Sequence, residues 1–169
     1  MSMESRYSDL CKEIEKFKNA KPATANYFKI DSGDWWKSLP AEVIPMPGGI
    51  YSDSSWEIAK DARDKLVVGK TLGEISFSKV STTKKSLEAV ISVSKEECGE
   101  VEDYFQLSIE QISDFNGNGL ADLLLKGYRV ERSDSCMLGS GNSLGAGFSV
   151  LVQKRNKTET PEIIEQNTK

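Results

Sequence analysis

Oxygen-bearing side chains recur at regular spacing between Asp114 and Asp122, and this spacing could bind a metal ion. The run reads Asp-Phe-Asn-Gly-Asn-Gly-Leu-Ala-Asp, with oxygen side chains at its first, third, fifth and ninth positions and glycine at its sixth. A calcium loop of the EF-hand type uses these positions, because alternating oxygens wrap a hard cation and the glycine permits a sharp turn. The candidate ligands are the side chains of Asp114, Asn116, Asn118 and Asp122 and the backbone carbonyl of Leu120.

The stretch departs from an EF-hand at its end. Leu125 occupies the position at which an EF-hand supplies a bidentate glutamate. Residues 123–130 are largely apolar and end in strand-forming residues, so we expect the loop to lead into a strand. Two carboxylates instead of three or four imply weak calcium binding, with a dissociation constant of roughly 10⁻⁴ to 10⁻³ M.

A tight turn without metal is the alternative interpretation of the same residues. Asn-Gly occurs twice in succession, which is a strong turn signal. Asp and Asn side chains can also accept hydrogen bonds from their own backbone without any metal. The spacing therefore predicts either a calcium loop or a turn.

Residues 114–122 resemble the Asp-x-Asn-x-Asn-Gly-x-x-Asp calcium loops of FG-GAP repeats, in which a strand follows the loop. Dockerin modules use a similar loop opening and follow it with a helix. Both families repeat the motif, whereas it occurs once in this chain. The resemblance implies calcium as the cofactor and no other cofactor.

Histidine is absent from the chain, and the three cysteines, Cys11, Cys98 and Cys136, lie far apart. These counts exclude the usual zinc sites, haem ligation by histidine and catalysis with imidazole as the base. An odd number of cysteines is typical of reduced thiols in a cytoplasmic protein. An oxidising compartment would instead allow a Cys98–Cys136 disulfide.

The net charge of −4 and the pI of 5.1 argue against nucleic-acid binding, which needs clustered Lys and Arg. The chain contains no apolar stretch long enough to cross a membrane. We therefore expect the partner to be another protein. If Met1 is the native start, we expect a cytoplasmic protein, because the first residues lack a secretory signal. If a leader was removed, we expect a periplasmic one.

Two groups of residues are candidates for binding that partner. An acidic run could attract a basic protein by long-range electrostatics, although a solvated loop is the alternative. Two adjacent tryptophans cannot face the same way on a helix, so one could be exposed as a binding anchor, with burial of both at the core edge as the alternative. The candidate residues are Glu96, Glu97, Glu100, Glu102, Asp103, Trp35 and Trp36.

Hydrophobic periodicity predicts an α+β fold, with N-terminal helices on one face of a mainly antiparallel sheet. Apolar residues at helical spacing predict helices over residues 7–17 and 54–66. Alternation with period two predicts about five strands, over residues 75–78, 87–94, 105–110, 123–130 and 147–154. We expect one domain over residues 1–154, followed by a polar and flexible tail over residues 155–169.

Two function classes fit these features. The first is a noncatalytic protein-binding domain, with the calcium loop in a structural role. In size and acidity the chain resembles the immunity proteins that neutralise bacterial toxins, and this resemblance implies a basic toxin domain as the partner. The alternative is a metal-dependent hydrolase that uses Asp114 and Asp122. We favour the first class, because the sequence shows no paired nucleophile and base.

Overall fold

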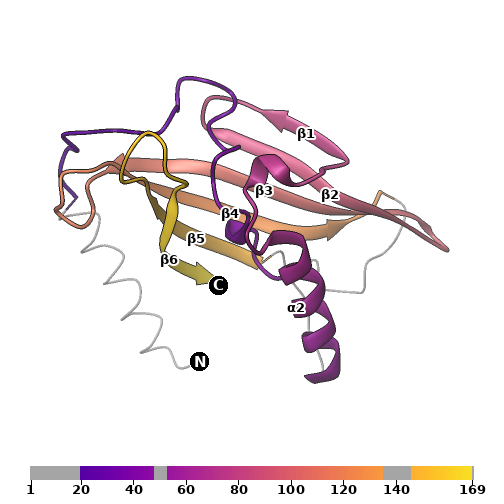
Figure 1. Cartoon of the computed structure of the whole chain (residues 1–169). Helices are drawn as coiled ribbons and strands as arrows, with labels where there is room; N and C mark the ends of the chain where they lie inside the picture. The colour runs from indigo at the N-terminus through magenta and orange to yellow at the C-terminus, as the bar shows by residue number, and fades with distance from the viewer. Residues whose placement is uncertain (1–19, 48–52, 135–145, 169) are drawn as a thin grey trace, which may run out of the picture.

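The computed structural model describes residues 20–47, 53–134 and 146–168. Its centre is one antiparallel sheet of six strands, in which each strand pairs with the next along the chain (Figure 1). The strands are β1 (Lys79–Thr82), β2 (Ser86–Glu96), β3 (Gly99–Ser113), β4 (Asp122–Arg132), β5 (Ala146–Gln153) and β6 (Glu162–Thr168). Within these ranges the helical elements are the α-helix α2 (Asp53–Val67) and two 3-10 turns, η1 (Ala41–Val43) and η2 (Leu72–Glu74). The predicted mixture of helix and antiparallel sheet is confirmed in this coarse form.

The C-terminal segment corrects two expectations. The sheet has six strands rather than five, because β6 pairs with β5 from Gln153↔Glu162 to Phe148↔Thr168. Residues 162–168 therefore belong to the sheet rather than to a flexible tail.

The predicted strand over 75–78 is misplaced. These residues follow η2 and belong to no strand, and β1 begins at Lys79.

The hydrophobic core lies between one face of the sheet and the chain that precedes β1. Apolar residues of β2 to β5 line that face, and irregular segments with η1 and η2 cover it. The covering residues are Phe28, Trp35, Trp36, Leu39, Ala41, Val43, Ile44, Val67, Leu72 and Ile75. Burial of these side chains supplies most of the driving force for folding.

Helix α2 contributes less to this cover than its periodicity suggests. It extends away from the sheet (Figure 1), and Ile58 near its middle is 72% exposed. Its C-terminal end joins the core of the described residues, through Leu66 and the fully buried Val67. The other predicted helix, over residues 7–17, lies outside the described residues. None of the helices in the described ranges is long and apolar enough to span a bilayer.

Candidate functional site

The candidate calcium loop connects β3, which ends at Ser113, to β4, which begins at Asp122. As expected, it leads into a strand. Its two Asn-Gly pairs form turns with Gly117 at φ +78° and Gly119 at φ +85°. Glycine suits both positions because L side chains rarely adopt positive φ.

The Asp114 carboxylate holds the loop together from within. The backbone N–H groups of Gly117 and Asn118 donate to its Oδ1 atom at 2.7 and 3.1 Å, and that of Gly119 donates to its Oδ2 atom at 2.7 Å. Burial alone would raise the pKa of Asp114, but the backbone donors together outweigh burial and lower it. The carboxylate is therefore held in its charged form.

Asp122 closes the other end of the loop and is fully buried. Its Oδ2 atom accepts the Phe115 N–H at 2.9 Å, and its Oδ1 atom accepts the side-chain amide of Gln153. Burial raises the pKa of the Asp122 carboxyl, and the charge of Asp114 raises it further. The two ends of the loop thus hold carboxylates with opposite pKa shifts.

Gln153 is a member of the site that the sequence did not single out. It lies at the end of β5 opposite Asp122 in the register, and its Oε1 atom accepts from the side-chain amide of Asn118 at 3.3 Å. One glutamine therefore links the middle of the loop to its end. Only the pairing of β4 with β5, across some thirty residues of sequence, brings it there.

The remaining candidate ligands stabilise the turn in the same way. The side-chain oxygen of Asn116 accepts the Asn118 N–H at 3.2 Å, and that of Asn118 accepts the Leu120 N–H at 2.9 Å. The loop also anchors the irregular segment around Thr24, which we call the connector. The Gly119 carbonyl accepts from the Thr24 N–H at 2.9 Å and from the Thr24 hydroxyl at 2.7 Å. The loop is therefore a junction of β3, β4, β5 and the connector.

The loop concentrates negative charge away from water. Asp114 is 4% exposed and Asp122 is fully buried, and neither forms an ion pair with a basic side chain among the described residues. The same part of the chain contains no group of three or more His, Cys, Asp or Glu side chains placed to hold a metal. The available donor set is two carboxylates, two amides and a carbonyl, which are hard oxygen donors suited to calcium.

The acidic run does not act as one surface. Glu102 forms ion pairs with Lys79 at 2.5 Å and with Arg132 at 2.9 Å, and the pKa of its carboxyl is lowered by these hydrogen bonds. Asp103 pairs with the buried Arg129 at 2.6 Å. Glu102 and Asp103 were expected to bind a partner through free carboxylates, and this expectation is corrected. Side chains alternate along a strand, so Glu102 and Asp103 lie on opposite faces of β3, each beside an arginine of β4.

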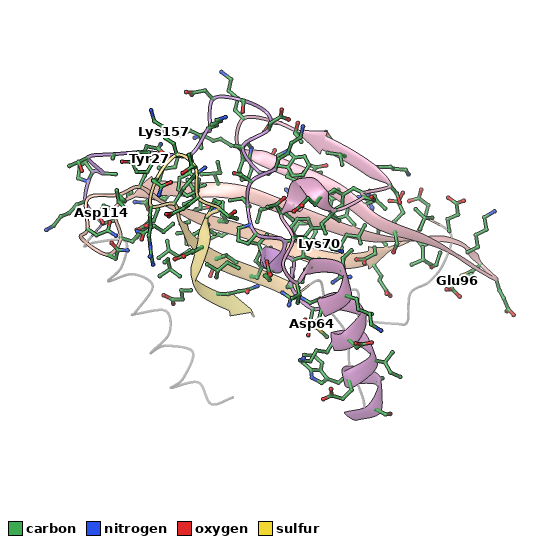
Figure 2. The ribbon with its side chains drawn as sticks, viewed as in Figure 1. Tyr27, Asp64, Lys70, Glu96, Asp114 and Lys157 are labelled. Carbon is green, nitrogen blue, oxygen red and sulfur yellow. The ribbon has the colours of Figure 1, made fainter. Side chains whose placement is uncertain are left out.

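The other three acidic residues remain exposed. Glu96, Glu97 and Glu100 lie at the turn between β2 and β3, which we call the acidic tip. Figure 2 shows Glu96 and Asp114 at opposite ends of the sheet, so the acidic tip and the candidate calcium loop are separate sites. Cys98, at the same turn, is disulfide-bonded, so the expectation of a reduced thiol is wrong for this cysteine.

Both tryptophans are buried, at 2% exposure for Trp35 and 6% for Trp36, so neither offers an exposed ring to a partner. The Trp35 indole donates to the Thr83 carbonyl at 3.2 Å, and the Trp36 ring packs edge-on against Phe77. Of the two interpretations of this pair, burial of both rings is confirmed and an exposed binding anchor is wrong, because these residues do not form a helix. Consecutive side chains can then both enter the core.

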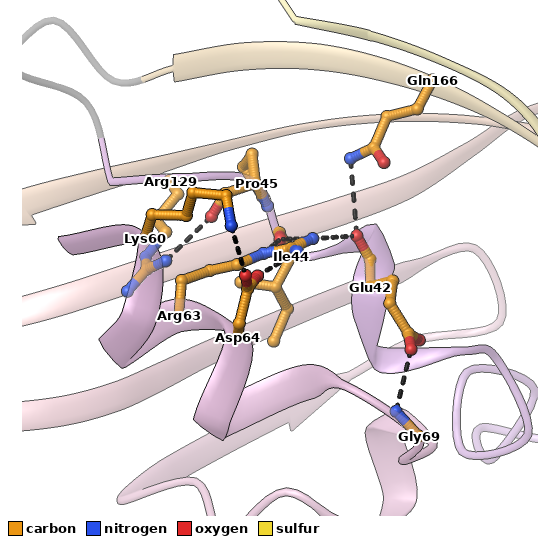
Figure 3. Close-up of polar contacts among 9 residues, drawn as sticks. All are labelled: Glu42, Ile44, Pro45, Lys60, Arg63, Asp64, Gly69, Arg129 and Gln166. Carbon is orange, nitrogen blue, oxygen red and sulfur yellow. Dashed lines mark hydrogen bonds and ion pairs between the residues drawn. The ribbon is translucent and has the colours of Figure 1, made fainter. Parts of the chain in front are cut away.

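A second polar cluster, absent from the sequence-based candidates, joins α2 and the sheet to the end of η1 (Figure 3). The Arg63 guanidinium donates to the carbonyls of Glu42 at 2.7 Å and Ile44 at 3.0 Å. Arg129 of β4 donates to the next carbonyl, that of Pro45, at 2.8 Å. These contacts satisfy carbonyls within and just after the 3-10 turn η1, so the cluster positions the segment that covers the core rather than forming a reactive centre.

Comparison with protein-family models, with curated proteins and with solved structures finds no match to this chain.

Proposed function

We propose that the protein is a noncatalytic protein-binding domain that uses the acidic tip to bind a basic partner. The observation that carries the proposal is the exposure of Glu96, Glu97 and Glu100 at the end of a long hairpin. Three carboxylates face water there with only Lys95 beside them in sequence. Such a concentration of charge accelerates encounter with a basic surface.

The partner class follows from the same charge. A basic toxin domain neutralised by a small acidic immunity-type protein has the required complementarity, and the sign of the tip disfavours nucleic acid. Opposite charges at the rim of an interface govern the association rate and the salt dependence of binding more than the dissociation rate. Binding should therefore weaken steeply as salt is added.

Capture from cells of the native host tests this function. The wild-type protein should retain a basic partner that a triple variant, Glu96→Gln with Glu97→Gln and Glu100→Gln, retains poorly. The matched control removes three exposed carboxylates elsewhere, with Glu57→Gln, Asp61→Asn and Glu159→Gln. Equally poor retention by the two triple variants would show that net charge, and not the tip, governs binding. Retention of the partner by the acidic-tip variant at the wild-type level would overturn the role of the tip. The captured protein, expressed separately, should associate with the wild type more slowly as salt concentration rises.

We further propose that the 114–122 loop holds a structural calcium ion. The support is the pair of buried carboxylates, Asp114 and Asp122, without a compensating cation among the described residues. Burying charge without compensation is costly, and calcium would offset the repulsion between the two groups. In this role calcium would stabilise the junction of strands and connector.

Calorimetry with calcium, and thermal melting with calcium or chelator, test the loop. We expect heat of binding in the weak range and a rise in Tm at millimolar calcium, the concentration that such sites require. Asp122→Asn should abolish both effects, whereas Asp31→Asn, at an exposed position, should leave them intact. Absence of heat and of any Tm shift would leave only a turn.

A further inference from the structure

The hairpin that carries the acidic tip has an edge with no paired strand among the described residues. β1 pairs with β2 only from Lys79↔Val90 to Thr82↔Leu87, yet β2 continues to Glu96. Among the described strands, β2 beyond Val90 therefore has β3 as its only neighbour. Figure 1 shows β2 and β3 extending past β1, and beyond the Glu102↔Arg132 pair with β4 they continue as a two-stranded arm.

The direction of the free backbone groups follows from the register. Val90 directs its carbonyl to the β1 side, where the Ser78 N–H donates to it at 2.7 Å. The irregularity between Val90 and Ser92 adds one residue to β2, so the outward direction passes to Val93 and Lys95. Their N–H and C=O groups thus face away from β3.

A strand edge of this kind binds extended polypeptide by backbone hydrogen bonds, and adjacent side chains select the sequence. Here Val93 is 40% exposed and offers an apolar contact. The acidic tip at the end of the edge favours lysine or arginine on the incoming segment. Pairing of two copies along this edge would bring two acidic tips near each other, which like-charge repulsion opposes.

We propose that the outer edge of β2, over residues 92–96, binds an extended basic segment of the partner as an added antiparallel or parallel strand. This inference rests on the proposed protein-binding function and specifies how the partner is held. The acidic tip then serves for attraction, and the backbone of β2 serves for retention. The acidic tip would therefore govern the association rate, and the backbone of β2 would govern the dissociation rate.

A synthetic peptide of alternating lysine and valine is the probe for strand addition. NMR titration should shift the amide signals of Val93 and Lys95 most. The control peptide has the same sequence with N-methyl groups on the alternate residues that would pair with β2. Methylation should weaken binding at least about tenfold, the loss expected for two or more backbone hydrogen bonds. Equal binding of the two peptides would overturn strand addition and leave only attraction by charge.

Two variants of the edge give the complementary test. Val93→Pro removes an N–H group that points away from β3, whereas Val93→Lys keeps this N–H but repels the basic peptide. Circular dichroism shows whether each variant folds. Both should weaken peptide binding at least about tenfold. Val68→Lys makes the same charge change at a site that is 61% exposed and follows α2, and it should bind as the wild type does.

The native partner separates failure of this inference from failure of the proposed function. Loss of partner capture in both the Val93 variants and the acidic-tip variant supports the inference. Loss in the acidic-tip variant alone overturns strand addition while the protein-binding function stands. Retention by all of these variants overturns both. A dimer of this chain that Val93→Pro dissociates would assign the edge to a second copy and overturn the proposed occupant.

Discussion

Arg129 of β4 binds both carboxylate oxygens of Asp103 on β3, with Nε 2.9 Å from Oδ1 and Nη2 2.6 Å from Oδ2. The remaining Nη1 atom donates to the Pro45 carbonyl. The side chain of Arg129 is 7% exposed and that of Asp103 is 17% exposed. A single guanidinium therefore joins two strands to the segment that covers the core, in a geometry that only arginine provides.

Loss of Arg129 should destabilise the fold strongly. Arg129→Met leaves Asp103 without its partner in a largely buried position, and such a change costs about 3–5 kcal/mol. Urea denaturation should show this loss in the free energy of unfolding. Arg132→Met is the control, because Arg132 is half-exposed and Glu102 keeps Lys79; we expect a loss of about 1 kcal/mol or less. Similar losses in the two variants would contradict the buried role of Arg129.

Gly127 should not tolerate a side chain. It lies on β4 between Leu107 and Phe148 in the register. A methyl group there would lie 2.2 Å from the Gln106 carbonyl oxygen and 2.7 Å from Cζ of Phe148, so backbone or ring must move. Gly127→Ala should therefore reduce the free energy of unfolding by roughly 1–3 kcal/mol, as overpacking does.

Gly147→Ala is the matched control on the neighbouring strand, since no atom lies within 4 Å of its methyl position. We expect its stability to equal or slightly exceed that of the wild type, because alanine restricts the unfolded chain. Chemical denaturation of both variants measures the contrast. If Gly127→Ala is as stable as Gly147→Ala, the packing of Phe148 over β4 is wrong.

The adjacent isoleucines of β6 should differ in their contribution to stability. Ile163 lies opposite Val152 and packs against the core, whereas Ile164 is 45% exposed. Ile163→Ala should cost roughly 1–3 kcal/mol, and Ile164→Ala should stay within about 0.5 kcal/mol. Thermal melting of the two variants gives the comparison. Small and equal effects would instead indicate that residues 155–169 form the frayed tail that composition suggests.

The alternation of apolar and polar residues predicted the central strands well, because burial of one face requires that pattern. It could not predict β6, since Pro161 and the polar residues after Ile164 conceal a strand that is held by its edge pairing. The short β1 was misplaced for a related reason. All four of its residues are exposed, so burial imposes no alternation on them.

The loop ligands were predictable from local spacing, whereas their partners were not. The Asp114 carboxylate accepts hydrogen bonds from residues within five positions of itself, so these bonds follow from turn chemistry. Gln153 reaches Asp122 from β5, and Arg129 reaches Asp103 across a strand pair. Such contacts depend on register, which one sequence specifies only through its hydrophobic pattern. The placement of Glu102 and Asp103 on opposite faces of the sheet could nevertheless have been predicted, because adjacent residues of a strand point to opposite faces.

The contribution of Asp122 to the stability of the metal-free protein should fall as pH rises above the ordinary Asp pKa of 3.8. The folded protein holds the Asp122 proton to higher pH than the unfolded chain does, because burial and the charge of Asp114 raise its pKa. Between the two pKa values the folded state binds more protons, so the free energy of unfolding declines with increasing pH. Asp114 acts in the opposite sense: its pKa is lowered, and its contribution disappears only as pH falls below 3.8.

Asp122→Asn removes the titrating group and should therefore flatten the decline that begins above the ordinary Asp pKa of 3.8. Urea denaturation with chelator present, at several pH values, measures the slope for the variant, the wild type and the exposed control Asp31→Asn. Added calcium should flatten the wild-type decline as well, because the ion binds the ionised carboxylate and competes with the proton. An identical slope in Asp122→Asn and Asp31→Asn would show that Asp122 keeps an ordinary pKa, and the buried-charge argument for calcium would then lose its basis.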